Sequence, residues 1–167
     1  QLKTRKVKRE YRAIVQGCPP VGDGTIDAPL GRDKYYRKRM AIQKDGTGRP
    51  SVTHFRVLKQ LGPYALLSLL LETGRTHQIR VHLASIGCPV VGDPLYGPKK
   101  APFRRQGQFL HARSLGFIHP RSNKYMEFVV EPGKEFCAFL KQEGKNDAQK
   151  TDHGCQRYPP SFDTHCP

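Results

Sequence analysis

The stretch Leu70-Leu-Glu-Thr-Gly-Arg-Thr-His-Gln-Ile-Arg-Val-His-Leu-Ala84 decides the interpretation of the rest of the chain. An apolar run ends in Glu-Thr-Gly, and a short polar and basic segment follows before apolar residues resume. This pattern predicts a buried strand, a tight turn at Gly74 and a helix from near Thr76 to near Ile86. The Thr76 hydroxyl is suited to accept a hydrogen bond from a free amide of the first turn. Gly87 is expected to follow as a left-handed cap.

Arg80 is the most informative residue of this predicted helix. At about 100° per residue, Ile79, Leu83 and Ile86 form an apolar stripe, and Arg80 falls on the neighbouring face. Its guanidinium is therefore expected to be partly buried, where it needs a carboxylate or a phosphate as partner. The spacing leaves two alternatives open: a structural carboxylate that Arg80 holds over the core, or an anion that belongs to a functional site.

Two histidines of the same helix resemble a metal-binding pair, but their spacing excludes it. His77 and His82 are five residues apart, which places them about 140° apart around a helix. They cannot bind one ion as an i, i+4 pair does. One histidine is expected to pack in the core and the other to line a cleft. Histidines and cysteines after residue 150 match no zinc spacing either, and we predict no metal site.

The net charge indicates a polyanionic partner. The 167 residues include 29 Lys and Arg against 14 Asp and Glu, giving a formal charge of +15. Such an excess destabilises a folded chain through self-repulsion unless a polyanion binds it. No apolar run approaches the ~18–20 residues of a membrane span, so RNA or DNA is favoured over a membrane surface. Five scattered cysteines without a Cys-x-x-Cys pair indicate reduced thiols and an intracellular protein.

Basic side chains gather in two segments, residues 31–40 and 99–105. The first contains two tyrosines, Tyr35 and Tyr36. It is either a solvated loop or an arm that contacts phosphates while its tyrosines stack on bases. The second segment is expected to be mobile. Both are candidate RNA contacts.

The remaining pattern predicts an α+β domain with a mixed, largely antiparallel sheet and a few helices. A turn-rich loop is expected at residues 17–24. The polar sequence from residue 143 onward is expected to be disordered, so residues 1–141 form the predicted domain and residues 142–167 a tail. The predicted strands are residues 11–15, 25–30, 52–61, 64–71, 109–118 and 125–131, and a closing helix is predicted at 135–141.

Two longer motifs resemble the RluA/RluD-type pseudouridine synthases. They are the segment from Glu72 to Ala84 quoted above, followed by Gly87, and Gly92-Asp-Pro-Leu-Tyr-Gly97. Shorter segments occur in the family's order, and the resemblance covers about residues 5–141. The shorter segments are Tyr11-Arg-Ala-Ile-Val15, Thr25-Ile-Asp-Ala-Pro-Leu-Gly31, Arg37-Lys-Arg-Met40, Thr53-His-Phe-Arg-Val-Leu58 and Leu110-His-Ala-Arg113.

The resemblance implies isomerisation of uridine to pseudouridine in structured rRNA or tRNA, by a monomeric cytoplasmic enzyme without metal or organic cofactor. The C–N glycosidic bond breaks, the uracil rotates, and a C–C bond forms. By position, Arg80 is the basic residue that pairs with the catalytic aspartate, and Tyr11 is the tyrosine that packs on the uracil. A sheet-face tyrosine in the core is the alternative for Tyr11. The candidate RNA-binding residues are Arg37, Lys38, Arg39, Arg75, His77 and Gln78.

The chain departs from the family at the nucleophile. The family's aspartate lies in a His-Arg-Leu-Asp segment upstream of the tyrosine strand, whereas residues 1–10 contain no aspartate. Asp27, Asp33 and Asp93 have turn or loop contexts of their own. We therefore expect the C-terminal part of a catalytic domain, N-terminally incomplete and inactive alone. The alternatives are a catalytically incompetent RNA-binding domain with the same basic cleft, and an unrelated basic protein such as a ribosome-associated domain.

Overall fold

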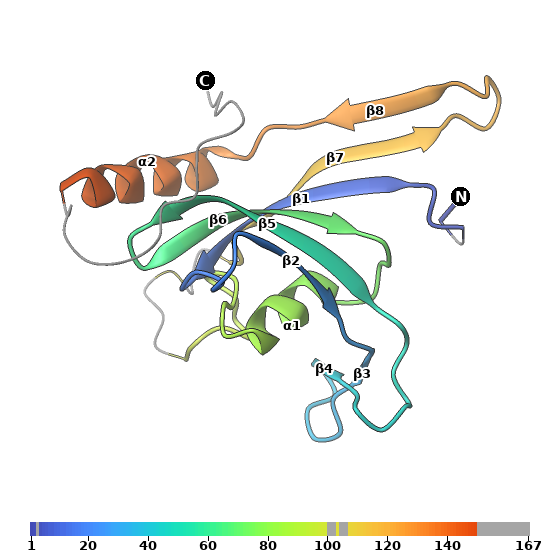
Figure 1. Ribbon diagram of the computed structural model, residues 1–167, viewed down its shortest axis with the longest axis horizontal. Helices are drawn as coiled ribbons and strands as arrows, with labels where there is room; N and C mark the ends of the chain where they lie inside the picture. Colours follow the sequence, from blue (N-terminus) through green and yellow to red (C-terminus); the bar gives the residue numbers. More distant parts are fainter. Residues whose placement is uncertain (3, 100–102, 104–106, 150–167) are drawn as a thin grey trace.

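Six strands form one sheet in which every neighbouring pair is antiparallel, in the order β2-β5-β6-β1-β7-β8. A computed structural model describes residues 1–149 apart from 3, 100–102 and 104–106. Helices α1 and α2 lie on opposite faces of the sheet, and a small hairpin, β3–β4, lies beyond its end (Figure 1). The elements are β1 (Lys8–Gln16), β2 (Asp23–Asp27), β3 (Leu30–Arg32), β4 (Met40–Ile42), β5 (Val52–Leu61), β6 (Tyr64–Leu71), α1 (Gln78–Ser85), β7 (Leu110–Ile118), β8 (Tyr125–Val129) and α2 (Lys134–Gln149).

The expected α+β class and largely antiparallel sheet are confirmed. The predicted bounds of β5 and β6 match the structure, and β6 lies inside the sheet between β5 and β1. Gly62 begins the short connection between these two strands and has a φ of 58°, which glycine adopts without steric cost. Strand β6 leads directly into the turn before α1, so the centre of the sheet fixes the position of that turn.

Each face of the sheet has its own core. The core on the α1 face joins Ala13, Leu67 and Leu69 of the central strands to Ile79 and Leu83 of the helix. Alternate side chains of the same strands point the other way. On that second face, α2 packs through Phe136 and Phe139 onto Ile14, Leu61, Leu66 and Phe109.

Helix α1 begins later than predicted. The residue at its N-cap is His77, which has a φ of 56° and makes no side-chain cap hydrogen bond, so the predicted cap at Thr76 is wrong. The Gln78 side chain takes over part of that role, because its carbonyl oxygen accepts from the Arg75 amide at 2.9 Å. The predicted cap at Gly87 is confirmed by its φ of 77° and by its amide bond to Ala84.

The basic segment 31–40, for which a solvated loop and a phosphate-contacting arm were the alternatives, forms most of a hairpin. Strands β3 and β4 pair antiparallel, and residues 33–39 connect them. The Asp33 carboxylate accepts hydrogen bonds from the amides of Tyr35 and Tyr36 at 2.8 and 2.9 Å, which orders the connection. The strand predicted at residues 25–30 instead ends at Asp27. Pro29 restricts the backbone there and removes an amide donor.

The closing helix is longer than the predicted 135–141. Helix α2 continues to residue 149, so it crosses the predicted boundary after residue 141 and includes residues 143–149, which were expected to be disordered. Four residues of this polar segment are good helix formers, whereas Gly144, Asn146 and Asp147 are poor ones, so propensity alone does not explain its helical conformation. Residues 150–167, with the remaining predicted tail, lie outside the described residues, as does most of the predicted second basic segment.

Strand β8 is exposed along its whole length at the edge of the sheet. With β7 it forms a hairpin that extends away from the rest of the molecule (Figure 1). Its neighbour β7 covers one side only, and within the described residues no strand pairs with its other side. Large apolar side chains are exposed on this hairpin: Leu115, Ile118, Tyr125, Met126, Phe128 and Val129.

Two leucines of β6 provide a matched test of this packing. Leu67 is fully buried in the core under α1, whereas Leu70 is 42% exposed on the opposite face. In the full-length protein, Leu67→Ala is expected to lower the free energy of unfolding by about 2–5 kcal/mol through lost burial and the cavity left behind. Leu70→Ala is expected to cost less than about 1 kcal/mol. Urea unfolding measures both, and equal losses would contradict the packing described.

Candidate nucleic-acid interface

A basic pocket of about 510 Å³ lies between the β3–β4 hairpin and the turn that precedes α1. The hairpin and its flanks form one wall, and residues 74–77 form the other. His77 lines it at the start of the helix, and no aspartate or glutamate among the described residues does so. The pocket is therefore electropositive throughout. Its lysine and arginine side chains are Arg32, Arg37, Lys38, Arg39, Arg49 and Arg75.

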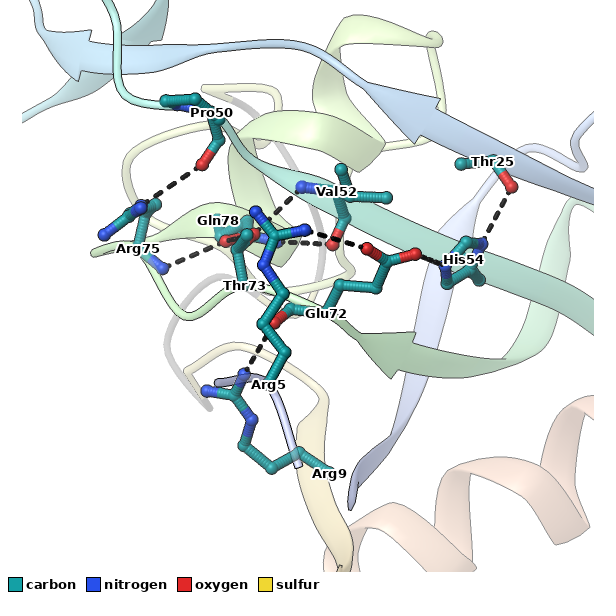
Figure 2. A network of polar contacts seen from close by, with 10 residues as sticks. All are labelled: Arg5, Arg9, Thr25, Pro50, Val52, His54, Glu72, Thr73, Arg75 and Gln78. Carbon is teal, nitrogen blue, oxygen red and sulfur yellow. Dashed lines mark hydrogen bonds and ion pairs between the residues drawn. The ribbon is translucent and has the colours of Figure 1, made fainter. Parts of the chain in front are cut away.

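The turn that forms the second wall is held from inside by Gln78. This side chain is only 3% exposed, and its amide is fully used (Figure 2). Its oxygen accepts from the Thr73 hydroxyl at 2.8 Å and from the Arg75 amide, while its nitrogen donates to the Val52 carbonyl at 2.9 Å and to Thr53 Oγ1 at 3.0 Å. Gln78 thus ties the start of β5 to the turn after β6.

A second set of polar contacts lies beside the first at Glu72. One carboxylate oxygen is 2.7 Å from Nε2 of His54, and the other accepts from Arg5 at 3.2 Å (Figure 2). Arg9 donates to the Glu72 carbonyl at 3.3 Å. A Cβ at Gly74 would lie 2.3 Å from Nη1 of Arg9, so a side chain there would displace that guanidinium. Because Nη1 is the end of a flexible side chain, that displacement would cost little.

Arg80 forms a bidentate ion pair with Asp93. Nε and Nη2 donate to the two carboxylate oxygens at 2.6 and 2.7 Å, and the Asp93 side chain is 0% exposed. Burial raises the pKa of Asp93, but the bonds from Arg80 and from the amides of Tyr96 and Leu95 outweigh it and hold that pKa below 3.8. The same bonding raises the pKa of Arg80. Both groups are ionised at neutral pH. The expected buried guanidinium is confirmed, and Asp93 is the structural carboxylate that was one of the two alternatives stated for its partner.

Tyr96 lies where three segments meet. Its hydroxyl accepts from the Met40 amide at 2.8 Å and is 2.9 Å from Nδ1 of His77. Its ring lies against the Arg80 guanidinium, with Cζ 5.1 Å from the ring centroid. One side chain therefore contacts both the buried ion pair and two residues that line the basic pocket, Met40 and His77.

The two histidines of the α1 region have the two roles expected of them. His82 is completely buried, with Nδ1 2.9 Å from the Thr53 hydroxyl and Nε2 3.0 Å from the Ala28 carbonyl. His77 lines the pocket. Burial lowers the pKa of each, and the positive charge of Arg80 lowers that of His77 further. Both imidazoles are neutral at pH 7.

Tyr11 lies in the middle of β1, opposite Leu69 of β6 and Ala112 of β7. Its side chain is partly buried against the core on the α1 face, together with Ala13 and Val15 as expected for alternate residues. The ring therefore contributes to the core and remains partly accessible, which fits both alternatives stated for it.

The structure brings together most of the predicted RNA-binding residues. Arg37, Lys38 and Arg39 face Arg75 and His77 across one pocket, although about 40 residues separate them in the sequence. Gln78 is the exception, because its amide is buried and occupied, so it positions the turn and cannot contact a ligand in this arrangement.

Two further residues were missed by sequence reasoning. Arg49 lines the pocket together with Arg32 of the predicted basic segment. Arg49 follows a glycine, a position that carries no signal for a cationic site. Tyr96 was part of the quoted Gly-Asp-Pro-Leu-Tyr-Gly motif, and its place in that motif was the available signal.

Two other properties concern the described residues alone. They contain no group of three or more His, Cys, Asp or Glu side chains arranged to hold a metal ion. None of their helices is long and apolar enough to cross a membrane.

Comparison with known proteins identifies the family. The family model for RNA pseudouridylate synthase matches residues 1–85, which is more than half of the chain. The chain belongs to the RNA pseudouridylate synthase family. The matched region includes the strand of Tyr11, the basic hairpin, the turn at Gly74 and the whole of α1.

Relatives agree in sequence and in fold. A protein of Chloroflexus aurantiacus named as an RNA pseudouridine synthase is 49% identical over 85% of this chain and 44% of its own length. Ribosomal large subunit pseudouridine synthase D of Zymomonas mobilis is 46% identical over 78% of this chain and 43% of its own length. The structure of human RNA pseudouridylate synthase domain containing 1 superposes with a TM-score of 0.69 at 31% identity, covering 78% of this chain and 56% of that one. The chain spans about half the length of the curated relatives it matches.

The buried ion pair predicts a large cost for a small change. Asp93→Asn keeps the shape of the side chain but leaves the Arg80 guanidinium buried without a counter-charge. The free energy of unfolding of the full-length protein is expected to fall by about 3–5 kcal/mol. Glu127→Gln, which removes the exposed partner of Lys8, is expected to cost at most about 1 kcal/mol. Urea unfolding of the two variants checks this, and similar small losses would contradict a structural role for the pair.

The lowered pKa of His82 predicts a loss of stability in mild acid. The unfolded chain binds a proton near the ordinary pKa of 6.5, whereas the folded chain does so only at lower pH. The contribution of His82 to the free energy of unfolding is therefore fully present above pH 6.5 and decreases as the pH falls below that value. The carboxylates with lowered pKa act in a separate window, below 3.8. Urea unfolding between pH 7 and pH 5 is expected to show a smaller decrease for His82→Gln, and an unchanged decrease would contradict the assignment.

Proposed function

We propose that this chain is part of an RNA pseudouridine synthase that isomerises uridine to pseudouridine in rRNA or tRNA. The observation that carries the proposal is the basic pocket, in which six lysine and arginine side chains converge with no acidic side chain in the described lining, within a chain of this family. Both relatives described above have names that include pseudouridine synthase.

The pocket suits RNA phosphates better than a base. Arginine and lysine side chains pair with phosphate oxygens through charge-assisted hydrogen bonds. Such contacts fix the position of a nucleic acid without reading its sequence. The side chain for stacking is Tyr35, which is 89% exposed at the tip of the hairpin. The ring of Tyr36 is already engaged by Arg39, whose Cζ lies 5.2 Å from its centroid.

Arg80 and Tyr11 are the proposed catalytic residues. Nε and Nη2 of Arg80 hold Asp93, while Nη1 has no hydrogen bond to another described residue. We assign to Nη1 the contact with the nucleophilic aspartate, which a guanidinium keeps ionised in a closed site. This chain has no His-Arg-Leu-Asp segment, so that aspartate belongs to another part of the full-length protein. The aspartate attacks at the ribose of a uridine taken out of its stack, and the Tyr11 ring packs on the uracil.

The remaining features of the proposal follow from the same family assignment. The reaction joins the same uracil to the same ribose through a different atom, so it is an isomerisation that consumes no second substrate. We propose that the enzyme works as a monomer, without metal or organic cofactor, in the cytoplasm where rRNA and tRNA are available.

The test is release of tritium from RNA that contains 5-³H-uridine, since a proton leaves C5 when the new bond forms. The full-length protein is expected to release it, and Arg80→Ala and Tyr11→Phe are each expected to lower kcat by about 100-fold or more. Arg56→Ala serves as the control and is expected to keep full activity. Arg56 is exposed on β5 and lies between Phe55 and Val57, which point toward the core under α1, so its side chain points to the other face of the sheet. A fully active Arg80→Ala, Tyr11→Phe double variant would overturn both assignments.

RNA binding without catalysis is the second candidate. It is favoured by one observation, that six cationic side chains of the basic pocket come from this chain, whereas the proposed nucleophile does not. A full-length protein that binds RNA with a steep dependence on salt but releases no tritium would support this function and exclude the first.

A further inference from the structure

The Tyr96 hydroxyl connects β4 to the start of α1, which no β-pairing joins. Strands β3 and β4 have three residues each and form their own two-stranded sheet, separate from the main one. A hairpin of this size is marginally stable alone. The hairpin is joined to the region around α1 by the hydrogen bond from the Met40 amide to the Tyr96 hydroxyl. Tyr96 is 56 positions further along the chain.

The Tyr96 hydroxyl forms hydrogen bonds on two sides. The Met40 amide can only donate, so Tyr96 Oη accepts from it. The hydroxyl lies 2.9 Å from Nδ1 of His77, where it donates to a neutral imidazole with its proton on Nε2 or accepts from one with its proton on Nδ1. A neutral imidazole agrees with the lowered pKa of His77. The hydroxyl therefore bridges β4 and the N-terminus of α1 through one hydrogen bond to each.

The ring of Tyr96 has a separate contact. It lies under the Arg80 guanidinium, and its own backbone amide donates to the Asp93 carboxylate at 3.0 Å. A cation over an aromatic face is attracted to it, more strongly when partly desolvated. The ring and the ion pair thus hold Arg80 from two sides, and the two ends of one side chain reach two different parts of the proposed site.

We propose that Tyr96 is a positioning residue that aligns the RNA-binding hairpin with Arg80. The hydroxyl fixes the basic wall of the pocket, and the ring fixes the guanidinium. RNA phosphates held in the pocket are thereby kept in a constant relation to the arginine of the reaction centre. This inference rests on the proposed function for the role of Arg80, whereas the expected effect of Tyr96 on RNA binding concerns the pocket alone.

Two substitutions in the full-length protein separate the two ends of the side chain. Tyr96→Phe removes the hydroxyl bonds and keeps the ring. It is expected to raise the Kd for RNA about 5–10-fold, as expected for the loss of one or two hydrogen bonds, with kcat within about twofold of wild type. Tyr96→Leu removes the ring as well and is expected to lower kcat by about 10-fold or more. A tyrosine that only stabilised the fold would not give one variant with a changed Kd alone and another with a lowered kcat.

A double-mutant cycle tests whether the hydroxyl acts through the hairpin. In a Lys38→Ala, Arg39→Ala background, Tyr96→Phe is expected to have no further effect on the Kd, because the cations it positions are gone. Tyr125→Phe, on the distant edge strand β8, is the control and is expected to change neither Kd nor kcat. The cycle uses only variants that retain the Tyr96 ring, so it stands even where Tyr96→Leu fails to fold.

The inference is overturned by either of two results: a Tyr96→Phe variant with wild-type Kd, or a Kd effect that persists in full without Lys38 and Arg39. Failure of the proposed function is distinguishable. A wild-type protein that binds RNA but releases no tritium removes the catalytic role of Arg80 and leaves the Kd predictions for Tyr96 to be decided by the same binding measurements.

Discussion

The ion pair between Arg80 and Asp93 is the constraint on which the candidate site depends. It joins a helix at the centre of the domain to the turn at residues 93–97, and it does so where water cannot replace either partner. Two backbone amides of that turn complete the coordination of the carboxylate. Because an unpaired charge at this depth is costly, the turn cannot move away from the helix without breaking the fold locally. The residues of this turn, including Tyr96, are therefore held in fixed positions.

The second wall of the pocket is fixed by a neutral group. Gln78 has no charge to neutralise, and its amide supplies two acceptor and two donor contacts in fixed directions. It can therefore hold a turn without adding an anion beside six cations. A carboxylate in its place would attract the arginines inward, toward the protein. The use of an amide there keeps the positive charge available to an external polyanion, which is the property that RNA binding requires.

Much of the fold was predictable from the sequence, and the limits have physical causes. Strands β5 and β6 were predicted to the residue, because their alternation and apolar content reflect burial directly. The N-terminus of α1 was misplaced, because the hydrogen bonds that define it come from a glutamine side chain inside the helix and from the distant β5. The length of α2 was underestimated, because its last turns lack the apolar spacing that reveals a helix in the sequence and contain the poor helix formers Gly144, Asn146 and Asp147.

Similar reasons apply to the site. Arg80 was recognised as a buried cation from its place beside the apolar stripe, and its carboxylate partner was expected in kind. The identity of that partner as Asp93 depends on how a turn folds back over the helix, which spacing does not encode. The convergence of residues 37–39 with Arg75 and His77 is a tertiary property of the same type. Charge indicated the ligand class, whereas topology determined the site.

The exposed edge strand β8 links the solubility of this chain to its net charge. An unpaired edge flanked by apolar side chains is a template for pairing with another copy, and the net charge of +15 opposes that approach. Salt weakens the repulsion, because the Debye length falls from about 8 Å at physiological ionic strength to about 3 Å at 1 M. The same salt releases bound polyanions. Conditions that strip nucleic acid from the protein are thus also the conditions that remove the electrostatic barrier between its sheet edges.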